Sequence, residues 1–116
     1  MSLNARLESH GRTTLVISEG RLDFGACAGF QAALEKALAS AGTLPAGLLI
    51  ECAGLDYVSS GGLRVFLLAA RAAQRTGVTF ALCALKPSVN EVFALSGFNQ
   101  IIPTFADRAA ALEQLP

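Results

Sequence analysis

Histidine and cysteine, which often serve at catalytic and metal sites, are scarce in this sequence. His10 is the only histidine and lies in a predicted turn, so a Ser-His-Asp triad lacks its base. Cys27, Cys52 and Cys83 are odd in number, widely spaced and form no C-x-x-C pair, which argues against disulfides or a zinc site. Each lies among apolar residues, so we expect three buried thiols. The sequence predicts no catalytic residue, metal ligand or cofactor.

Motifs of common enzyme classes are also missing. The segment "VSSGGL" is not the G-x-S-x-G of a nucleophile elbow. There is no G-x-G-x-x-G, and no glycine-rich loop is followed by the Lys-Ser/Thr of a P-loop. We therefore expect a protein that is not an enzyme.

An excess of charge of one sign is lacking as well. Nine Lys and Arg balance nine Asp and Glu, which disfavours nucleic acid as a partner. No apolar run approaches the ~20 residues that span a bilayer, and the first residues lack the apolar core of a secretory signal. We expect a cytoplasmic protein that does not insert into membranes and whose partner is a protein or a small molecule.

The 116 residues, 53% apolar and 16% charged, predict one globular domain, residues 1–116. Strand-like alternation flanks a turn at residues 10–12, which predicts two short strands. Helices are expected at 27–41, 61–75, 87–96 and 107–115, and further strands at 46–52, 78–84 and 100–105, with residues 53–60 as a loop. The order ββαβαβαβα predicts an α/β fold with about four helices on a mixed central sheet.

Two serines and two glycines, Ser59, Ser60, Gly61 and Gly62, stand between a predicted strand and the helix at 61–75. One serine is expected to cap the helix by accepting hydrogen bonds from its first N–H groups. Capping does not explain two glycines, each of which weakens a helix by up to ~1 kcal/mol relative to Ala. Small residues here leave a hydroxyl uncovered, and a phosphate on it would face the positive end of the helix dipole.

These segments resemble the STAS domains of anti-sigma-factor antagonists. "LIECAGLDYVSSGGLRVFLLAARAA" is similar to the signature in which a strand leads through Asp-Ser-Ser/Thr-Gly-Leu into a helix. "GRLDF" resembles the Gly-x-Leu-Asp ahead of the first helix, and "LSGFNQII" resembles a later segment of the family. The resemblance extends over nearly the whole chain.

By this resemblance, Ser60 matches the serine that is phosphorylated. Ser59 stands where the family has Asp, so it removes a carboxylate and is itself an alternative acceptor. Gly61 stands at the Ser/Thr position, and Asp23 matches an aspartate that lies near the acceptor in the family. Glu51 matches an aspartate at the end of a strand.

The resemblance implies partner switching. The unphosphorylated antagonist binds an anti-sigma factor with serine-kinase activity and releases a sigma factor; phosphorylation then dissociates the complex. ATP and magnesium belong to the kinase. Two alternatives stay open: a scaffold subunit of a lipid-transport ABC ATPase complex, and a small-ligand or nucleotide sensor with a pocket near Asp23 and Ser60. A monomer is expected, with a weak dimer as the alternative.

Helix geometry predicts one further surface. At about 100° per residue, the core face of the helix at 61–75 comprises Leu63, Phe66, Leu67, Ala70 and Ala73. A separate strip contains Arg64, Leu68, Arg71 and Arg75, with Val65 and Ala72 beside it. The strip is either a solvated edge with one exposed leucine or a docking surface for an acidic partner, with Leu68 as anchor.

Overall fold

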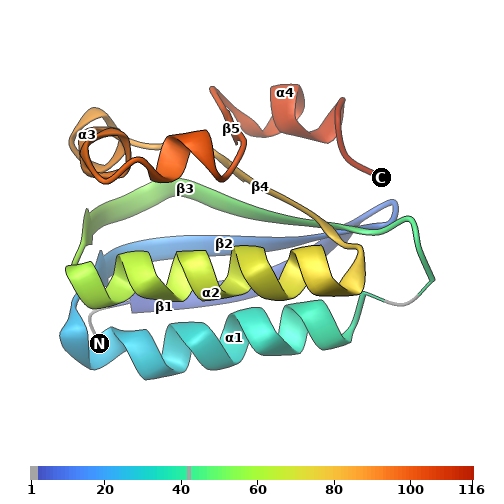
Figure 1. The fold of residues 1–116 in the computed structure, drawn as a ribbon, viewed down its shortest axis with the longest axis horizontal. Coiled ribbons are helices and arrows are strands. Elements are labelled where there is room, and N and C mark those ends of the chain that lie inside the picture. The colour runs from blue at the N-terminus through green and yellow to red at the C-terminus, as the bar shows by residue number, and fades with distance from the viewer. Residues whose placement is uncertain (1–2, 42) are drawn as a thin grey trace.

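The structure is a computed structural model that describes residues 3–41 and 43–116. Five strands form one sheet in the order β1-β2-β3-β4-β5, with four α-helices and two short 3₁₀ turns in the described chain (Figure 1). The elements are β1 (Leu3–His10), β2 (Thr13–Leu22), η1 (Phe24–Ala26), α1 (Cys27–Ala39), β3 (Gly47–Val58), α2 (Ser60–Thr76), β4 (Thr79–Cys83), α3 (Pro87–Leu95), η2 (Phe98–Gln100), β5 (Thr104–Phe105) and α4 (Arg108–Leu112). The predicted order of strands and helices is confirmed.

The sheet is mixed, as predicted. β1 and β2 form an antiparallel hairpin, and Gly11 adopts φ +60° in its turn, a conformation that suits glycine. β2, β3, β4 and β5 are parallel neighbours. The carboxyl ends of β2 and β3 therefore lie at the same edge of the sheet.

Helices cover the two faces of the sheet unequally. One face packs against α1, α2 and α3 in the larger core cluster, and the other holds a smaller cluster that includes Ala111 of α4. β4 divides its side chains between the two clusters: Phe80 and Leu82 enter the larger cluster, whereas Ala81 and Cys83 enter the smaller one. The short α4 leaves part of the second face to polar side chains.

The helix α2 is buried on two sides. Its Phe66 ring lies 5.3 Å from Phe30 of α1 and 5.2 Å from Phe93 of α3, measured between ring centroids. Phe66 and Ala73 of the predicted core face are buried, and its other members are partly exposed. The predicted face was centred too far from α1: Val65 and Ala69 are also buried, because α1 packs beside α2 (Figure 1).

The strand β3 is longer than predicted. Residues 53–60 were expected to form a loop, but the strand continues to Val58 and pairs with Leu22 of β2 there. Leu55 and Val58 are buried and stabilise this continuation. Glu51 therefore lies within β3, and the prediction that it ends a strand is wrong.

Candidate functional site

The two segments singled out in the sequence, "GRLD" and "SSGG", meet at the carboxyl edge of the sheet. The backbone N–H of Ser59 donates a hydrogen bond of 2.9 Å to the carbonyl of Leu22, the last residue of β2. Because β2 and β3 run parallel, residues that follow each strand emerge side by side. The fold thus places Asp23 and the start of α2 in one region.

The two serines have different roles. Ser59 is the N-cap of α2: its Oγ accepts a hydrogen bond of 3.1 Å from the N–H of Gly62, and its residue is half-buried. Ser60 is the first residue of the helix and is exposed. Of the two hydroxyls, that of Ser60 is therefore the one presented to solvent at a helix N-terminus.

The two glycines let α2 start close to the sheet. A Cβ on Gly62, which is buried, would lie 2.7 Å from two side-chain carbons of Leu22 and 3.1 Å from Val58. A Cβ on Gly61 would lie 3.2 Å from the Sγ of Cys27. Packing against Leu22 and Val58 therefore explains the glycine at position 62. The sequence analysis had explained both glycines by the need to leave a serine hydroxyl uncovered.

Asp23 and Cys27 hold the neighbouring turn. A side-chain oxygen of Asp23 accepts a hydrogen bond of 3.1 Å from the N–H of Ala26, so Asp23 caps η1. The thiol of Cys27 donates to the carbonyl of Asp23 at 3.3 Å and lies 3.8 Å from the Oγ of Ser59. Its half-buried position contradicts the prediction of a buried core thiol, because it sits under the helix start at the rim of the core.

The other two cysteines are buried, as predicted. Burial raises the pKa of both thiols, and raises that of Cys83 to about 11. Both therefore stay protonated and unreactive at neutral pH. Among the described residues, no group of three or more His, Cys, Asp or Glu could hold a metal ion.

Two exposed aromatic side chains, which no sequence motif indicated, follow or precede the site segments closely in the chain. Phe24, next to Asp23, is 88% exposed. Tyr57, next to the last residue of β3, is 40% exposed, and the guanidinium carbon of Arg21 lies 4.3 Å from its ring centroid. β3 does not alternate strictly here, since Asp56 and Tyr57 are both exposed between buried Leu55 and Val58, so the period of a strand does not single out Tyr57.

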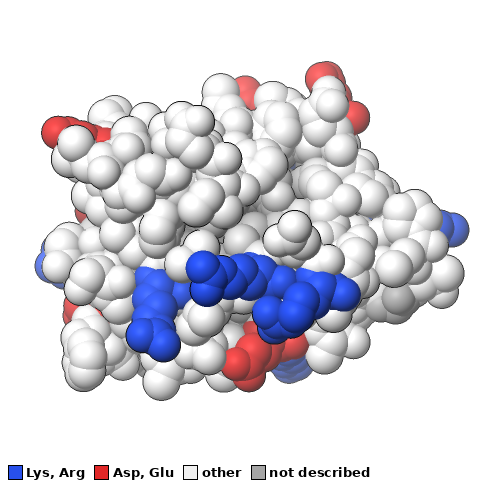
Figure 2. Space-filling view, viewed as in Figure 1, with Lys and Arg blue, Asp and Glu red and all other residues white. Residues whose placement is uncertain are grey.

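The predicted arginine strip is exposed along α2. Arg64, Leu68, Arg71 and Arg75 all reach solvent, and Figure 2 shows basic side chains in a band across this face. Leu68 is 36% exposed and lines a groove of about 290 Å³ between α1 and α2. Glu35 of α1 lines the same groove, so the strip has an acidic neighbour that the helix pattern could not show.

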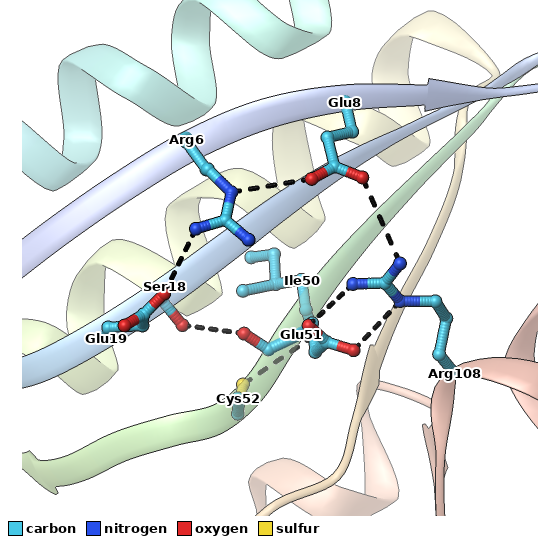
Figure 3. A network of polar contacts seen from close by, with 8 residues as sticks. All are labelled: Arg6, Glu8, Ser18, Glu19, Ile50, Glu51, Cys52 and Arg108. Carbon is cyan, nitrogen blue, oxygen red and sulfur yellow. Dashed lines mark hydrogen bonds and ion pairs between the residues drawn. The ribbon is translucent and has the colours of Figure 1, made fainter.

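Glu51 belongs to a different cluster, on the face that α4 partly covers. Arg108 donates two hydrogen bonds to its carboxylate, of 2.9 and 2.8 Å, and also lies 3.9 Å from Glu8 (Figure 3). These bonds lower the pKa of Glu51. Arg6 continues the network to Glu8 at 3.4 Å and Glu19 at 3.2 Å. The network joins β1, β2, β3 and α4, and it is separate from the serine region.

The chain matches a family model, and similar proteins are known. A model described as the STAS domain matches residues 4–111. BtrV of Bordetella bronchiseptica, described as an anti-sigma factor antagonist, is 45% identical over 64 residues, which cover 55% of this chain and 55% of BtrV. The chain thus spans about half the length of that relative.

Solved structures share the fold. An anti-sigma factor antagonist from Mycobacterium paratuberculosis superposes with a TM-score of 0.86 at 21% identity, covering 98% of this chain and 94% of that one. Unphosphorylated SpoIIAA gives a TM-score of 0.77 at 22% identity, covering 96% and 95%. The phosphorylated form of the Bacillus SpoIIAA gives a TM-score of 0.70 at 21% identity, covering 96% of this chain and 98% of that one.

No helix among the described residues has the length and apolar character needed to cross a membrane.

Proposed function

The chain belongs to the STAS domain family, and we propose that it acts as an anti-sigma factor antagonist switched by a phosphate on Ser60. The proposal rests on the different positions of the two serines. Ser59 is engaged in capping, whereas Ser60 presents an exposed hydroxyl at the start of α2. Similarity to BtrV and to the SpoIIAA structures supports this function.

The switch would act on binding and leave the fold intact. A phosphate on Ser60 carries about −1.5 to −2 charges at pH 7. At the first position of α2 that charge faces the positive end of the helix dipole, which favours it. Inside an interface the same charge must be desolvated, and any partner carboxylate would repel it. The modified chain therefore stays folded while its complex dissociates.

The partner would be an anti-sigma factor with serine-kinase activity, which supplies ATP and magnesium. We propose that its binding surface surrounds Ser60 and comprises Asp23, Ser59, Gly61, Gly62, Arg64, Leu68 and Arg71. Gly62 is buried, so it contributes only by drawing the helix start against β2. Phe24 extends this surface, because a side chain that is 88% exposed can bury most of its area on docking.

A pull-down from the native cell tests the proposal. The bait is the tagged chain, and the variants Ser60→Asp and Ser59→Asp serve as a matched pair. Mass spectrometry should identify a serine-kinase anti-sigma factor bound to the wild type and one phosphate on Ser60. Ser60→Asp should lose that partner while its circular dichroism spectrum is unchanged.

Two results would contradict the proposal. Capture of an ABC ATPase and permease, with equal binding by Ser60→Asp and wild type, would support a fixed scaffold. A phosphate found on Ser59 alone would shift the acceptor by one residue. In that case the capping hydroxyl would have to leave Gly62 before it could react.

A further inference from the structure

The strand β1 forms an open edge of the sheet. Among the described residues, it is the outermost strand and pairs with β2 alone, although it is eight residues long. Proteins often block such an edge with a proline or a bulge, and β1 has no proline and no register shift against β2. The N–H and C=O groups on its outer side can therefore pair with another strand. From these observations and from the charges of Arg6 and Glu8, we propose that β1 pairs antiparallel with β1 of a second copy of this chain.

The charges of β1 select one register for this pairing. Arg6 and Glu8 lie on the face of the α4 network, whereas Leu3 and Ala5 pack on the helix-covered core. When Leu7 of one copy lies opposite Leu7 of the other, Arg6 of each copy lies opposite Glu8 of the other. Opposite charges in such cross-strand pairs stabilise, whereas like charges destabilise.

Other registers are disfavoured. A shift of two residues places either Arg6 opposite Arg6 or Glu8 opposite Glu8. A shift of one places either Arg6 or Glu8 opposite Leu7 and turns the helix-covered faces to opposite sides of the joined sheet. Among the registers within two residues of it, the register centred on Leu7 alone places opposite charges across from each other, and it is the same from either copy, as the shared surface of a two-fold dimer must be.

Leu7 supplies the apolar centre of the interface. It is 37% exposed and lies on the helix-covered face, since it pairs with Val16 of the core. At the two-fold axis the two Leu7 side chains contact each other and lose this exposure. One strand pair and two leucines make a small interface, so the dimer is weak and depends on concentration.

The dimer leaves both serine surfaces free. Because β1 of one copy runs antiparallel to β1 of the other, the two β2 strands also run in opposite directions. The carboxyl edges that carry Ser60 then lie at opposite ends of a ten-stranded sheet, twice the five of one chain. Each copy can bind its own partner, and failure of this pairing would leave the proposed function of Ser60 untouched.

A charge exchange tests the register. Arg6→Glu and Glu8→Arg should each lower the dimer fraction in sedimentation velocity, because each places like charges across the axis. An equimolar mixture should form a heterodimer, since positions 6 and 8 are both acidic in the first variant and both basic in the second. We expect the dimer fraction of the mixture to exceed that of either variant several-fold. Circular dichroism of each variant confirms folding, and a mixture that stays monomeric overturns the proposal.

A cross-link tests the same contact without altering charge. In Leu7→Cys the two Cα atoms would lie about 4.5–5.5 Å apart, which is within disulfide range. Ser9→Cys is the control: Ser9 faces Ala5 of the other copy, and the two Ser9 residues lie about 13 Å apart along the strands. Mild oxidation should form a disulfide-linked dimer of Leu7→Cys, whereas Ser9→Cys and the wild type, with its half-buried Cys27, should form no covalent link. Equal linking of both variants would refute this pairing.

Discussion

Replacing Gly62 with alanine tests whether the glycine at the start of α2 serves packing. The added Cβ would lie 2.7 Å from Cγ and Cδ2 of Leu22 and 3.1 Å from Cγ1 of Val58. Leu22 is 0% exposed and Val58 5%, so neither can move into solvent. Overpacking of this kind typically costs about 1–3 kcal/mol. Alanine recovers up to ~1 kcal/mol of helix propensity, so we expect a net loss of about 1–2 kcal/mol.

Gly61→Ala is the matched control. It offers the same gain in propensity, but its Cβ would lie 3.2 Å from the Sγ of half-buried Cys27 and 3.8 Å, an ordinary contact distance, from the Oγ of Ser59. We expect its free energy of unfolding to stay within about 0.5 kcal/mol of wild type. Urea unfolding of both variants measures the difference. A Gly62→Ala chain as stable as Gly61→Ala would show that packing does not require the glycine.

Three further predictions follow from particular contacts. Ser59→Ala should lower the free energy of unfolding by about 1 kcal/mol through the lost cap, whereas Ser60→Ala should stay within about 0.5 kcal/mol; equal losses would mean that the cap is wrongly assigned. Leu68 is 36% exposed, so Leu68→Ala should lower the free energy of unfolding by less than the 2–5 kcal/mol typical of a buried leucine. The same change should raise the rate of dissociation from the proposed partner. A loss of stability of about 2–5 kcal/mol would place Leu68 in the core. Since Arg108 lowers the pKa of Glu51, the ionised form adds stability above the usual pKa of 4.5, and this contribution is lost as pH falls through the lower folded-state pKa. Urea unfolding of Glu51→Gln should therefore show its deficit at neutral pH and a narrowing gap in acid; a gap independent of pH would exclude this linkage.

The order of elements could be predicted because each strand and helix carries a local signal of its own, either a period or, as at residues 46–52, a short apolar run. The end of β3 could not, because Leu55 and Val58 read as parts of a loop until β2 is placed beside them. Similarly, the periodicity of α2 located its arginine strip, but burial of Val65 depends on α1, which lies elsewhere in the chain. The end of β3 and the burial of Val65 could not be predicted because each depends on an element that lies elsewhere in the chain.

The serine region shows the same limit in its chemistry. The motif indicated that one serine caps α2, yet two adjacent hydroxyls of the same chemistry left the choice open. The choice follows from the path of the chain: the N–H of Ser59 is held by the carbonyl of Leu22, which fixes Ser59 in extended backbone before the helix begins. Its Oγ then reaches the N–H of Gly62, and Ser60 is left as the first helical residue, exposed to solvent. The end of β2 thus determines which hydroxyl stabilises the helix and which residue is left exposed to solvent. Because capping falls to Ser59, the phosphate that we propose on Ser60 would change binding without removing the cap on which α2 depends.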